Sequence, residues 1–564
     1  MKNFKNLSVV LGLSVLLFSQ ACISTEKKAM DNSQMRSELV QEEVMSAPAG
    51  KTVTNTATKL KKQAPVPTAK DSKGDVTDNI APVDEEKDKE DFNTEEYNRI
   101  YENPFLEVTK NPLSTFSIDV DTASYTNVRR YLNSKMTPPK DSVRIEEMIN
   151  YFTYKYPQPK VDKPFSINLE YSASPWKEDH KLLEIGLQGK KIDTEKMPPN
   201  NLVFLLDVSG SMGDLNKLPL LKSAFKLLVS QLRDIDTVSI VVYAGSSGIV
   251  LEPTSGKNKE KILSALDSLE SGGSTAGGEG IKLAYKVAKE NLLPKGNNRV
   301  ILATDGDFNV GASSDSELIR MIEEKRQQGI FLTVLGFGMG NYKDSKMEQL
   351  ADKGNGNYSY IDDIKEAKKV LITEMGGTLL TIAKDVKLQI EFNPAKVSSY
   401  RLIGYENRLL RNEDFNDDTK DAGELGSGHT VTALYEIVPA GVQANTSKID
   451  DLKYQDTKIK PESLNSKEVL TVKFRYKDPN ADTSKLISET LQDSQMIPLD
   501  KTSDNFRFAT SVAGFGLLLR QSEYKGNITY DKVIDMAEKA KGQDSEGYRD
   551  EFINLVKTAE SLVK

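Results

Sequence analysis

The chain is poor in the residues that most often build metal centres and catalytic pairs. Its 564 residues include one cysteine, Cys22, and two histidines, His180 and His429. A single cysteine excludes a disulfide within the chain, and its position at the extreme N-terminus leaves neither histidine a thiol partner for nucleophilic catalysis. We interpret the two histidines as surface or packing residues.

The common enzyme motifs are also missing. Ser209 does not lie in a G-x-S-x-G elbow, because Asp207 stands where a glycine is needed. The glycine-rich segment GGSTAGGEG (272–280) lacks the Lys-Ser/Thr ending of a phosphate-binding P-loop. We therefore expect that the protein is not an enzyme.

The chain also lacks a net positive charge and long apolar runs. The net charge is −8 and the isoelectric point is about 5.4, which argues against a nucleic-acid partner. After the first 22 residues no stretch reaches the roughly 18 apolar residues of a membrane-spanning helix. We expect no transmembrane helix in the body of the chain.

The N-terminus has the layout of an export signal. Lys2 and Lys5 precede an apolar stretch over 7–18, and Ser19-Gln20-Ala21 then leads to Cys22. This resembles a bacterial lipoprotein signal, which implies cleavage of residues 1–21 and lipidation of Cys22, although Leu is usual where Ser19 stands. An ordinary signal peptide that leaves a spare thiol is the alternative. We expect a lipid-anchored protein of the bacterial cell envelope, at the outer membrane, with its periplasmic or surface face left open.

The segment after the cysteine looks unable to fold. Residues 23–91 contain no Phe, Tyr or Trp and are rich in Lys, Glu, Thr, Ser and Pro. Such a composition cannot bury enough apolar area to offset the entropy of ordering. We interpret 22–95 as a disordered tether between the lipid and the folded body.

In the middle of the chain, at 198–376, apolar strands alternate with amphipathic helices. The expected strands are 201–208, 237–244, 299–305, 331–338 and 357–362, and the expected helices are about 217–232, 259–269, 280–292, 315–328 and 345–352. This alternation predicts an α/β domain with a doubly wound parallel sheet.

The flanks, 96–197 and 377–564, have a different pattern. Strands are expected at 113–121, 165–173, 181–189, 385–393, 398–405, 430–438 and 468–477, and helices at 122–135, 143–152, 364–382, 506–520, 531–540 and 548–563. We expect the strands on both sides to form one β-sandwich, so that the central domain is an insertion, with helices at the C-terminus.

Five oxygen-bearing residues of the central domain have the chemistry of a metal site. Asp207, Ser209 and Ser211 are spaced i, i+2, i+4 directly after a buried strand, which points them to one side. Asp305 follows a second such strand, and Thr275 lies in the glycine-rich loop. Ligands of doubly wound sheets bind at the carboxyl ends of the strands, at the switch point. Mg²⁺ prefers about six oxygens with one or two carboxylates, and Mn²⁺ or Ca²⁺ would also be compatible.

This arrangement resembles the metal-ion-dependent adhesion site of the von Willebrand factor type A (VWA) family. The resemblance covers about 198–376 and implies that Asp207, Ser209, Ser211, Thr275 and Asp305 bind the metal, the aspartates often through water. It also implies a protein partner whose acidic side chain completes the metal's shell. The flanking stretches FSIDVDTASYTNVRRYL and VRIEEMINYF, with NNRVILATDGDFNVG, resemble bacterial lipoproteins that carry a VWA domain between further segments.

Two other functions stay open at this stage. One is an Mg²⁺-dependent hydrolase or phosphotransferase that uses Asp119 and Asp121. That D-x-D motif lacks the usual Thr or Val, because Ala123 stands two residues after the second aspartate, and capping with local hydrogen bonding fits it better. The other is a structural envelope scaffold in which the metal stabilises the fold.

Overall fold

The computed structural model describes residues 94–160, 162–275, 277–306, 308, 314–443, 453–454 and 458–564. The predicted signal peptide, Cys22 and nearly all of the predicted tether lie outside the described residues. Thr94 and Glu95, at the end of that stretch, are described and ordered: the backbone N–H of Thr94 donates to the Gly340 carbonyl, and Glu95 pairs with Arg130 at 2.8 Å. None of the helices in the described part is both long enough and apolar enough to cross a membrane.

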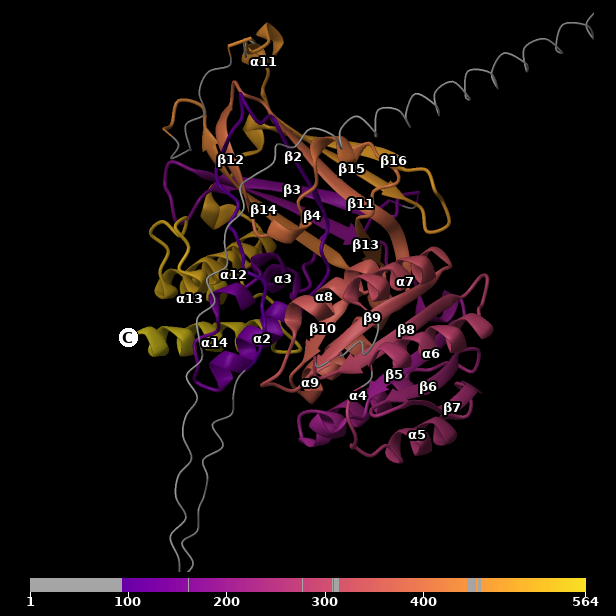
Figure 1. The fold of residues 1–564 in the computed structure, drawn as a ribbon. Helices are drawn as coiled ribbons and strands as arrows, with labels where there is room; N and C mark the ends of the chain where they lie inside the picture. The colour runs from indigo at the N-terminus through magenta and orange to yellow at the C-terminus, as the bar shows by residue number, and fades with distance from the viewer. Residues whose placement is uncertain are drawn as a thin grey trace, which may run out of the picture. The chain divides into compact units, whose positions relative to one another are not determined.

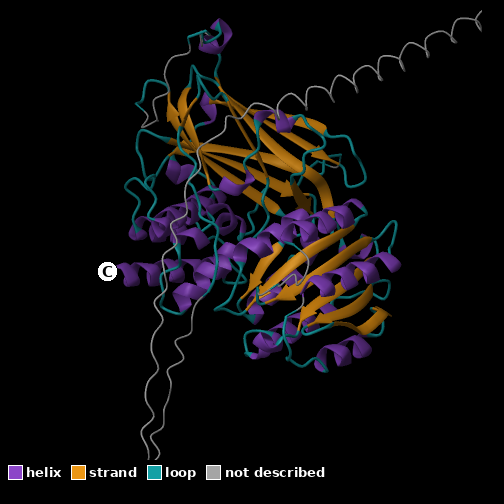
Figure 2. Cartoon of the chain, in the orientation of Figure 1, coloured by secondary structure: helices purple, strands orange, loops and turns teal. Residues whose placement is uncertain are grey.

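The central domain is built on a six-stranded sheet with helices on both faces (Figures 1 and 2). In spatial order its strands are β10 (Tyr358–Ile361), β9 (Ile330–Phe337), β8 (Asn297–Thr304), β5 (Asn200–Asp207), β6 (Thr237–Tyr243) and β7 (Ser247–Ser255). All neighbours are parallel except β6 and β7. The doubly wound parallel sheet is therefore confirmed, and the antiparallel edge strand β7 is an addition that the sequence pattern did not predict.

The buried strands of this sheet separate two cores. All eight residues of β5 are buried, as expected for a parallel strand covered on both faces. Leu202, Phe204 and Leu206 pack on one face against α4, whereas Val203 and Leu205 pack on the other face against α6. The helices are α4 (Leu218–Ser230), α5 (Lys259–Asp267), α6 (Gly277–Glu290), α7 (Asp315–Gln327) and α8 (Asp344–Lys353).

The strands on both sides of the central domain form two further sheets. One has the order β1 (Leu106–Glu107), β12 (Val397–Ile403), β14 (Thr430–Pro439), β4 (Lys181–Gly189) and β3 (Phe165–Ala173). The other has the order β13 (Gly423–Gly426), β11 (Thr381–Phe392), β15 (Glu468–Lys477) and β16 (Lys485–Gln492), with β2 (Leu113–Ser117) paired to β11.

The two sheets share one apolar core, to which Phe116 and Leu388 contribute from one sheet and Leu183 and Tyr435 from the other. The first sheet pairs β4, which precedes the central domain, with β14, which follows it. The expected sandwich with an inserted central domain is therefore present.

Helices from both ends of the folded chain form a fourth core. These are α2 (Ala123–Asn133), α3 (Ile145–Asn150), α12 (Asp504–Arg520), α13 (Tyr530–Lys539) and α14 (Tyr548–Val563), with a short α11 (Pro461–Asn465) outside the cluster. In Figure 1 the C-terminal helices lie beside α2 and α3.

One predicted helix is wrong in its extent. The segment 364–382 is not continuous but consists of α9 (Ile364–Lys368), a π-helical turn (Lys369–Thr373) and α10 (Met375–Leu379), and Thr381 already begins β11. Gly376 and Gly377 lie in α10 and lower its helix propensity.

Candidate metal site

Two adjacent parallel strands bring the two aspartates of the predicted site to one edge of the sheet. Asp207 is the last residue of β5, and Asp305 directly follows Thr304, the last residue of β8. The strands are in register, with Leu206 opposite Ala303. Both carboxylates are buried, at 0% and 2% exposure.

Asp207 is held by three hydrogen-bond donors. Its Oδ1 accepts from the backbone N–H of Ser209 at 2.9 Å, and its Oδ2 accepts from the hydroxyls of Tyr243 and Thr304, each at 3.0 Å. Burial raises its pKa to about 6, and the charge of Asp305 adds to the rise while the hydrogen bonds oppose it. A bound cation would favour the ionised carboxylate, because opposite charge lowers a carboxyl pKa.

The two serines lie next to this aspartate. The Ser209 and Ser211 hydroxyl oxygens are 3.1 Å apart; Ser209 is buried, whereas Ser211 is exposed. The Ser209 hydroxyl therefore lies near the buried Asp207 carboxylate, and the Ser211 hydroxyl lies at the surface.

The loop that carries Thr275 is fastened to the serine loop by backbone hydrogen bonds. Gly210 N–H donates to the Gly273 carbonyl at 3.0 Å, and Gly272 N–H donates to the Val208 carbonyl at 2.8 Å. Gly273 has φ +80°, which glycine adopts without strain. Thr275, two residues on, is half-buried. The structure thus brings Asp207, Ser209, Ser211 and Asp305 to one edge and holds the loop of Thr275 beside them.

A lysine also reaches the site, and the sequence reasoning missed it. Lys217, just before α4, places its Nζ 3.1 Å from Asp305 Oδ2 although the residue is only 7% exposed. In the sequence, the position of Lys217 could have indicated this contact, because it follows Ser211 by six residues and stands at the start of a predicted helix. Asp305 therefore has a cationic partner from within the chain.

The donor set is dominated by neutral hydroxyls. Within the described ranges, no group of three or more His, Cys, Asp or Glu side chains has the arrangement of a metal centre. Two carboxylates and three hydroxyls are instead the hard-oxygen set that Mg²⁺ and similar ions accept. The residues present therefore fit a hard divalent cation.

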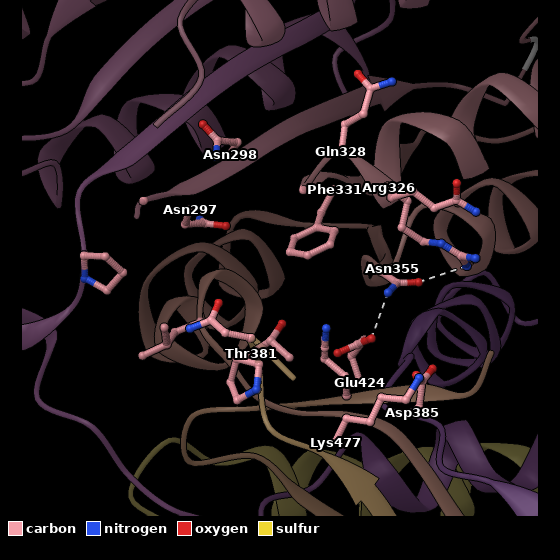
Figure 3. A pocket seen from close by; sticks show the side chains of 18 of the residues that line it. Asn297, Asn298, Arg326, Gln328, Phe331, Asn355, Thr381, Asp385, Glu424 and Lys477 are labelled. Carbon is pink, nitrogen blue, oxygen red and sulfur yellow. Dashed lines mark hydrogen bonds and ion pairs between the residues drawn. The ribbon is translucent and has the colours of Figure 1, made fainter. Parts of the chain in front are cut away.

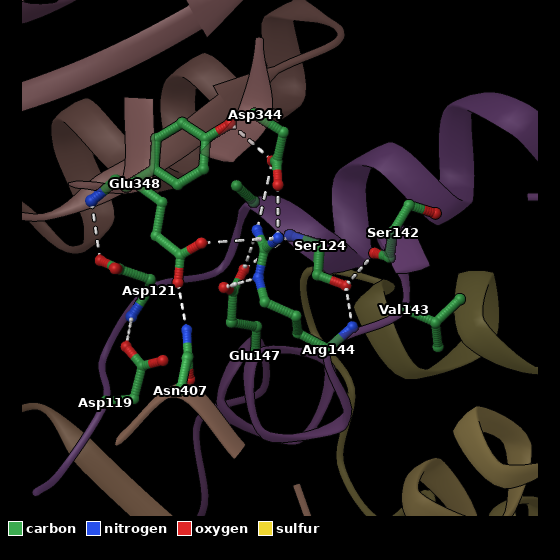
Figure 4. Close-up of polar contacts among 12 residues, drawn as sticks. Asp119, Asp121, Ser124, Ser142, Val143, Arg144, Glu147, Asp344, Glu348 and Asn407 are labelled. Carbon is green, nitrogen blue, oxygen red and sulfur yellow. Dashed lines mark hydrogen bonds and ion pairs between the residues drawn. The ribbon is translucent and has the colours of Figure 1, made fainter. Parts of the chain in front are cut away.

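The D-x-D motif lies beside the start of the edge strand β10, three strands away from β5 (Figure 4 shows Asp119 and Asp121). Asp121 Oδ1 accepts from the N–H of Tyr358, the first residue of β10, and its Oδ2 accepts from Arg408 at 3.0 Å. Asp119 lies 3.2 Å from the same guanidinium and accepts the Asp121 N–H, which is the predicted local bond. The expected side-chain cap on α2 is absent: neither Asp121 nor the N-cap Thr122 caps the helix with its side chain. These aspartates and the five oxygen-bearing residues do not form one site.

A cleft of about 1020 Å³ also lies away from the five residues (Figure 3). It is lined by the amino ends of β8 and β9, with Asn297 and Phe331, and by Thr381, Glu424 and Lys477 of the sandwich. Its polar lining mixes acidic and basic side chains, so it does not select a ligand of one charge.

Three family models match the chain. The von Willebrand factor type A domain matches 201–372, a von Willebrand factor model matches 91–184, and the C-terminal region of uncharacterized protein YfbK matches 377–562.

The relatives are consistent with these matches. Uncharacterized protein YfbK of Escherichia coli (strain K12) is 44% identical over 477 residues, which cover 83% of this chain and 82% of that protein. Inter-alpha-trypsin inhibitor heavy chain H3 of Homo sapiens is 26% identical over 28% of this chain and 18% of that protein. Among solved structures, a von Willebrand factor type A protein from Catenulispora acidiphila has a TM-score of 0.39 at 14% identity, over 72% of this chain and 92% of that one.

Proposed function

Because the chain belongs to the family of uncharacterized protein YfbK and contains a von Willebrand factor type A domain, we propose that it binds a protein partner through a divalent metal. The ligands of this metal are Asp207, Ser209, Ser211, Thr275 and Asp305. The observation that carries the proposal is the convergence of two buried carboxylates from β5 and β8 with a hydroxyl-bearing loop that backbone hydrogen bonds hold in place.

The chemistry of the ligands defines the kind of partner. Two carboxylates roughly neutralise a divalent ion, and the hydroxyls add no charge, so the metal keeps affinity for one more anionic oxygen. An acidic side chain of another protein supplies such an oxygen. Mg²⁺ is the ion we favour, with Mn²⁺ or Ca²⁺ as substitutes.

The proposal includes attachment to the membrane and the absence of catalysis. The lipid on Cys22 and the segment up to residue 95 would hold the folded body at the cell envelope. Catalysis is not part of it: the proposal assigns both carboxylates, Asp207 and Asp305, to the metal, and Asp119 and Asp121 are paired with Arg408 beside the start of β10.

The test is a capture experiment with the full-length protein in detergent. Envelope extract is passed over the wild type with Mg²⁺, the wild type with EDTA, the Asp305→Ala variant and the exposed control Asp535→Ala. We expect the wild type and the Asp535→Ala control to retain a protein from the extract when Mg²⁺ is present. The wild type in EDTA and the Asp305→Ala variant should not retain it. Retention that persists in EDTA and in Asp305→Ala would contradict the proposal. Cys22→Ala should in addition leave the membrane fraction.

A further inference from the structure

Lys217 is a buried charge aimed at a residue that we assign to the metal. Its Nζ lies 3.1 Å from Asp305 Oδ2 and 3.7 Å from Asp214 Oδ2, and its side chain is 8% exposed. Lysine is almost never buried without a charged partner. Its position is therefore built around Asp305.

The fold makes room for the stem of this lysine. A Cβ at Gly338, just after β9, would lie 2.4 to 2.9 Å from Cε, Cγ and Cδ of Lys217, so a side chain there would displace the lysine stem. Gly338 also has φ +73°. The stem is thus packed from the β9 side, while the ammonium at its end donates to Asp305 and pairs with Asp214 at a longer distance.

We infer that Lys217 is a built-in competitor of the metal: its ammonium holds the oxygen of Asp305 and must yield to a divalent ion, so it sets the metal affinity of the site. This inference rests on the proposed function for the existence of a metal site, but not for the partner. A divalent ion within a few ångströms of Asp305 is repelled by the lysine's charge, since the effective dielectric of such sites is far below that of water.

Asp214 provides the place to which the ammonium moves. Its side chain is 74% exposed, and its Oδ2 is already within 4 Å of Nζ. When the Lys217 ammonium moves from Asp305 to Asp214, the lysine stays paired with a carboxylate and its aliphatic stem stays in place. Asp214 therefore lowers the cost of displacement without removing it.

The direct test is calorimetric titration of the full-length protein in detergent with MgCl₂ and MnCl₂. We expect Lys217→Met, which keeps the apolar stem and removes the charge, to bind both ions on the order of tenfold more tightly than the wild type. Lys226→Met, within α4 but 41% exposed and paired with Asp267, should bind like the wild type. Binding by Lys217→Met that is equal to or weaker than that of the wild type would overturn the inference and leave the metal site intact. No binding by either protein would overturn both proposals.

Asp214→Asn gives a second test, made in the wild type and in the Lys217→Met background. We expect it to weaken metal binding several-fold, because the ammonium loses its alternative acceptor. In the Lys217→Met background the same substitution should have little effect. An equal effect in both backgrounds would mean that Asp214 acts on the metal directly, and the inference would fail.

Discussion

At the scale of single residues, several carboxylates are buried where their ionisation is unfavourable. Glu184 in β4 is 2% exposed, faces Glu170 across the β3–β4 pair, and accepts a hydrogen bond from the Tyr156 hydroxyl at 2.8 Å. Burial raises its pKa to about 8, and the charge of Glu170 adds to the rise. Folding therefore favours the protonated form of this side chain.

The pH dependence follows from this raised pKa. The folded protein retains the Glu184 proton up to about pH 8, whereas the unfolded chain releases it near 4.5. The resulting stabilisation is complete below about pH 4.5 and is lost as the pH rises through 8, by up to about 5 kcal/mol. We expect Glu184→Gln to lack this loss, so that its free energy of unfolding exceeds that of the wild type at pH 8.5 but not at pH 4.5, measured by urea denaturation.

A matched substitution separates this effect from a general one. Glu391→Gln, at an exposed position of β11 beside Lys473, should follow the wild type at both pH values. A wild type whose stability does not fall between pH 4.5 and 8.5 relative to Glu184→Gln would contradict the prediction.

At the scale of elements, glycines decide how closely α6 approaches the sheet beneath the metal site. A Cβ at Gly280 would lie 2.8 Å from Cβ of Tyr243 in β6, and one at Gly277 would lie 2.7 Å from the ring of Phe308. Tyr243 in turn donates its hydroxyl hydrogen bond to Asp207. The spacing between α6 and β6 therefore helps to fix the first carboxylate of the site.

Gly280→Ala should push α6 and β6 apart. We expect a net loss of about 1–2 kcal/mol in the free energy of unfolding, because overpacking costs about 1–3 kcal/mol while the gain in helix propensity is at most about 1 kcal/mol. Metal affinity should also fall, because Tyr243 moves. Gly248→Ala in β7, where a Cβ meets no atom within 4 Å, should change neither. A Gly280→Ala protein with wild-type stability would show that the helix can move freely.

At the scale of the whole molecule, a buried arginine joins the inserted domain to both flanks. Arg129 of α2 contacts Asp362 and Glu366 at the end of the central domain and Glu551 of α14, at 2.8–2.9 Å. It is 2% exposed. Segments more than 400 residues apart in the chain therefore meet at one guanidinium.

Arg129→Met should leave three carboxylates near one another without their cation. Removal of one partner from a buried ion network costs about 3–5 kcal/mol, because the remaining charge stays desolvated. We expect a loss of that order in urea denaturation, followed by the fluorescence of Trp176, which packs in the helical core.

The control is Lys539→Ala, which breaks an exposed pair with Asp535 and should cost less than about 1 kcal/mol. If Arg129→Met lost no more than this control, the arginine would not couple the domains energetically.

The sequence by itself determined the features that depend on local order along the chain. Continuous apolar runs such as 202–206 and the helices between them were sufficient to predict the doubly wound sheet, because parallel strands buried on both faces have that pattern. The i, i+2, i+4 spacing of Asp207, Ser209 and Ser211 predicted a common side for an extended segment, whereas Ser211 lies in a 3-10 turn over Gly210–Gly213 and only its contact with Ser209 brings it to the site.

Only the tertiary structure decided the features that join distant segments or run against the local pattern. The strand β7 has four exposed residues at an edge and gives no strong strand signal. The pairing of Lys217 with Asp305, 88 residues apart, and the meeting of α2 with α14 at Arg129 depend on which elements pack together. Charges become partners across such distances only after the apolar cores have folded, and no local pattern encodes that choice.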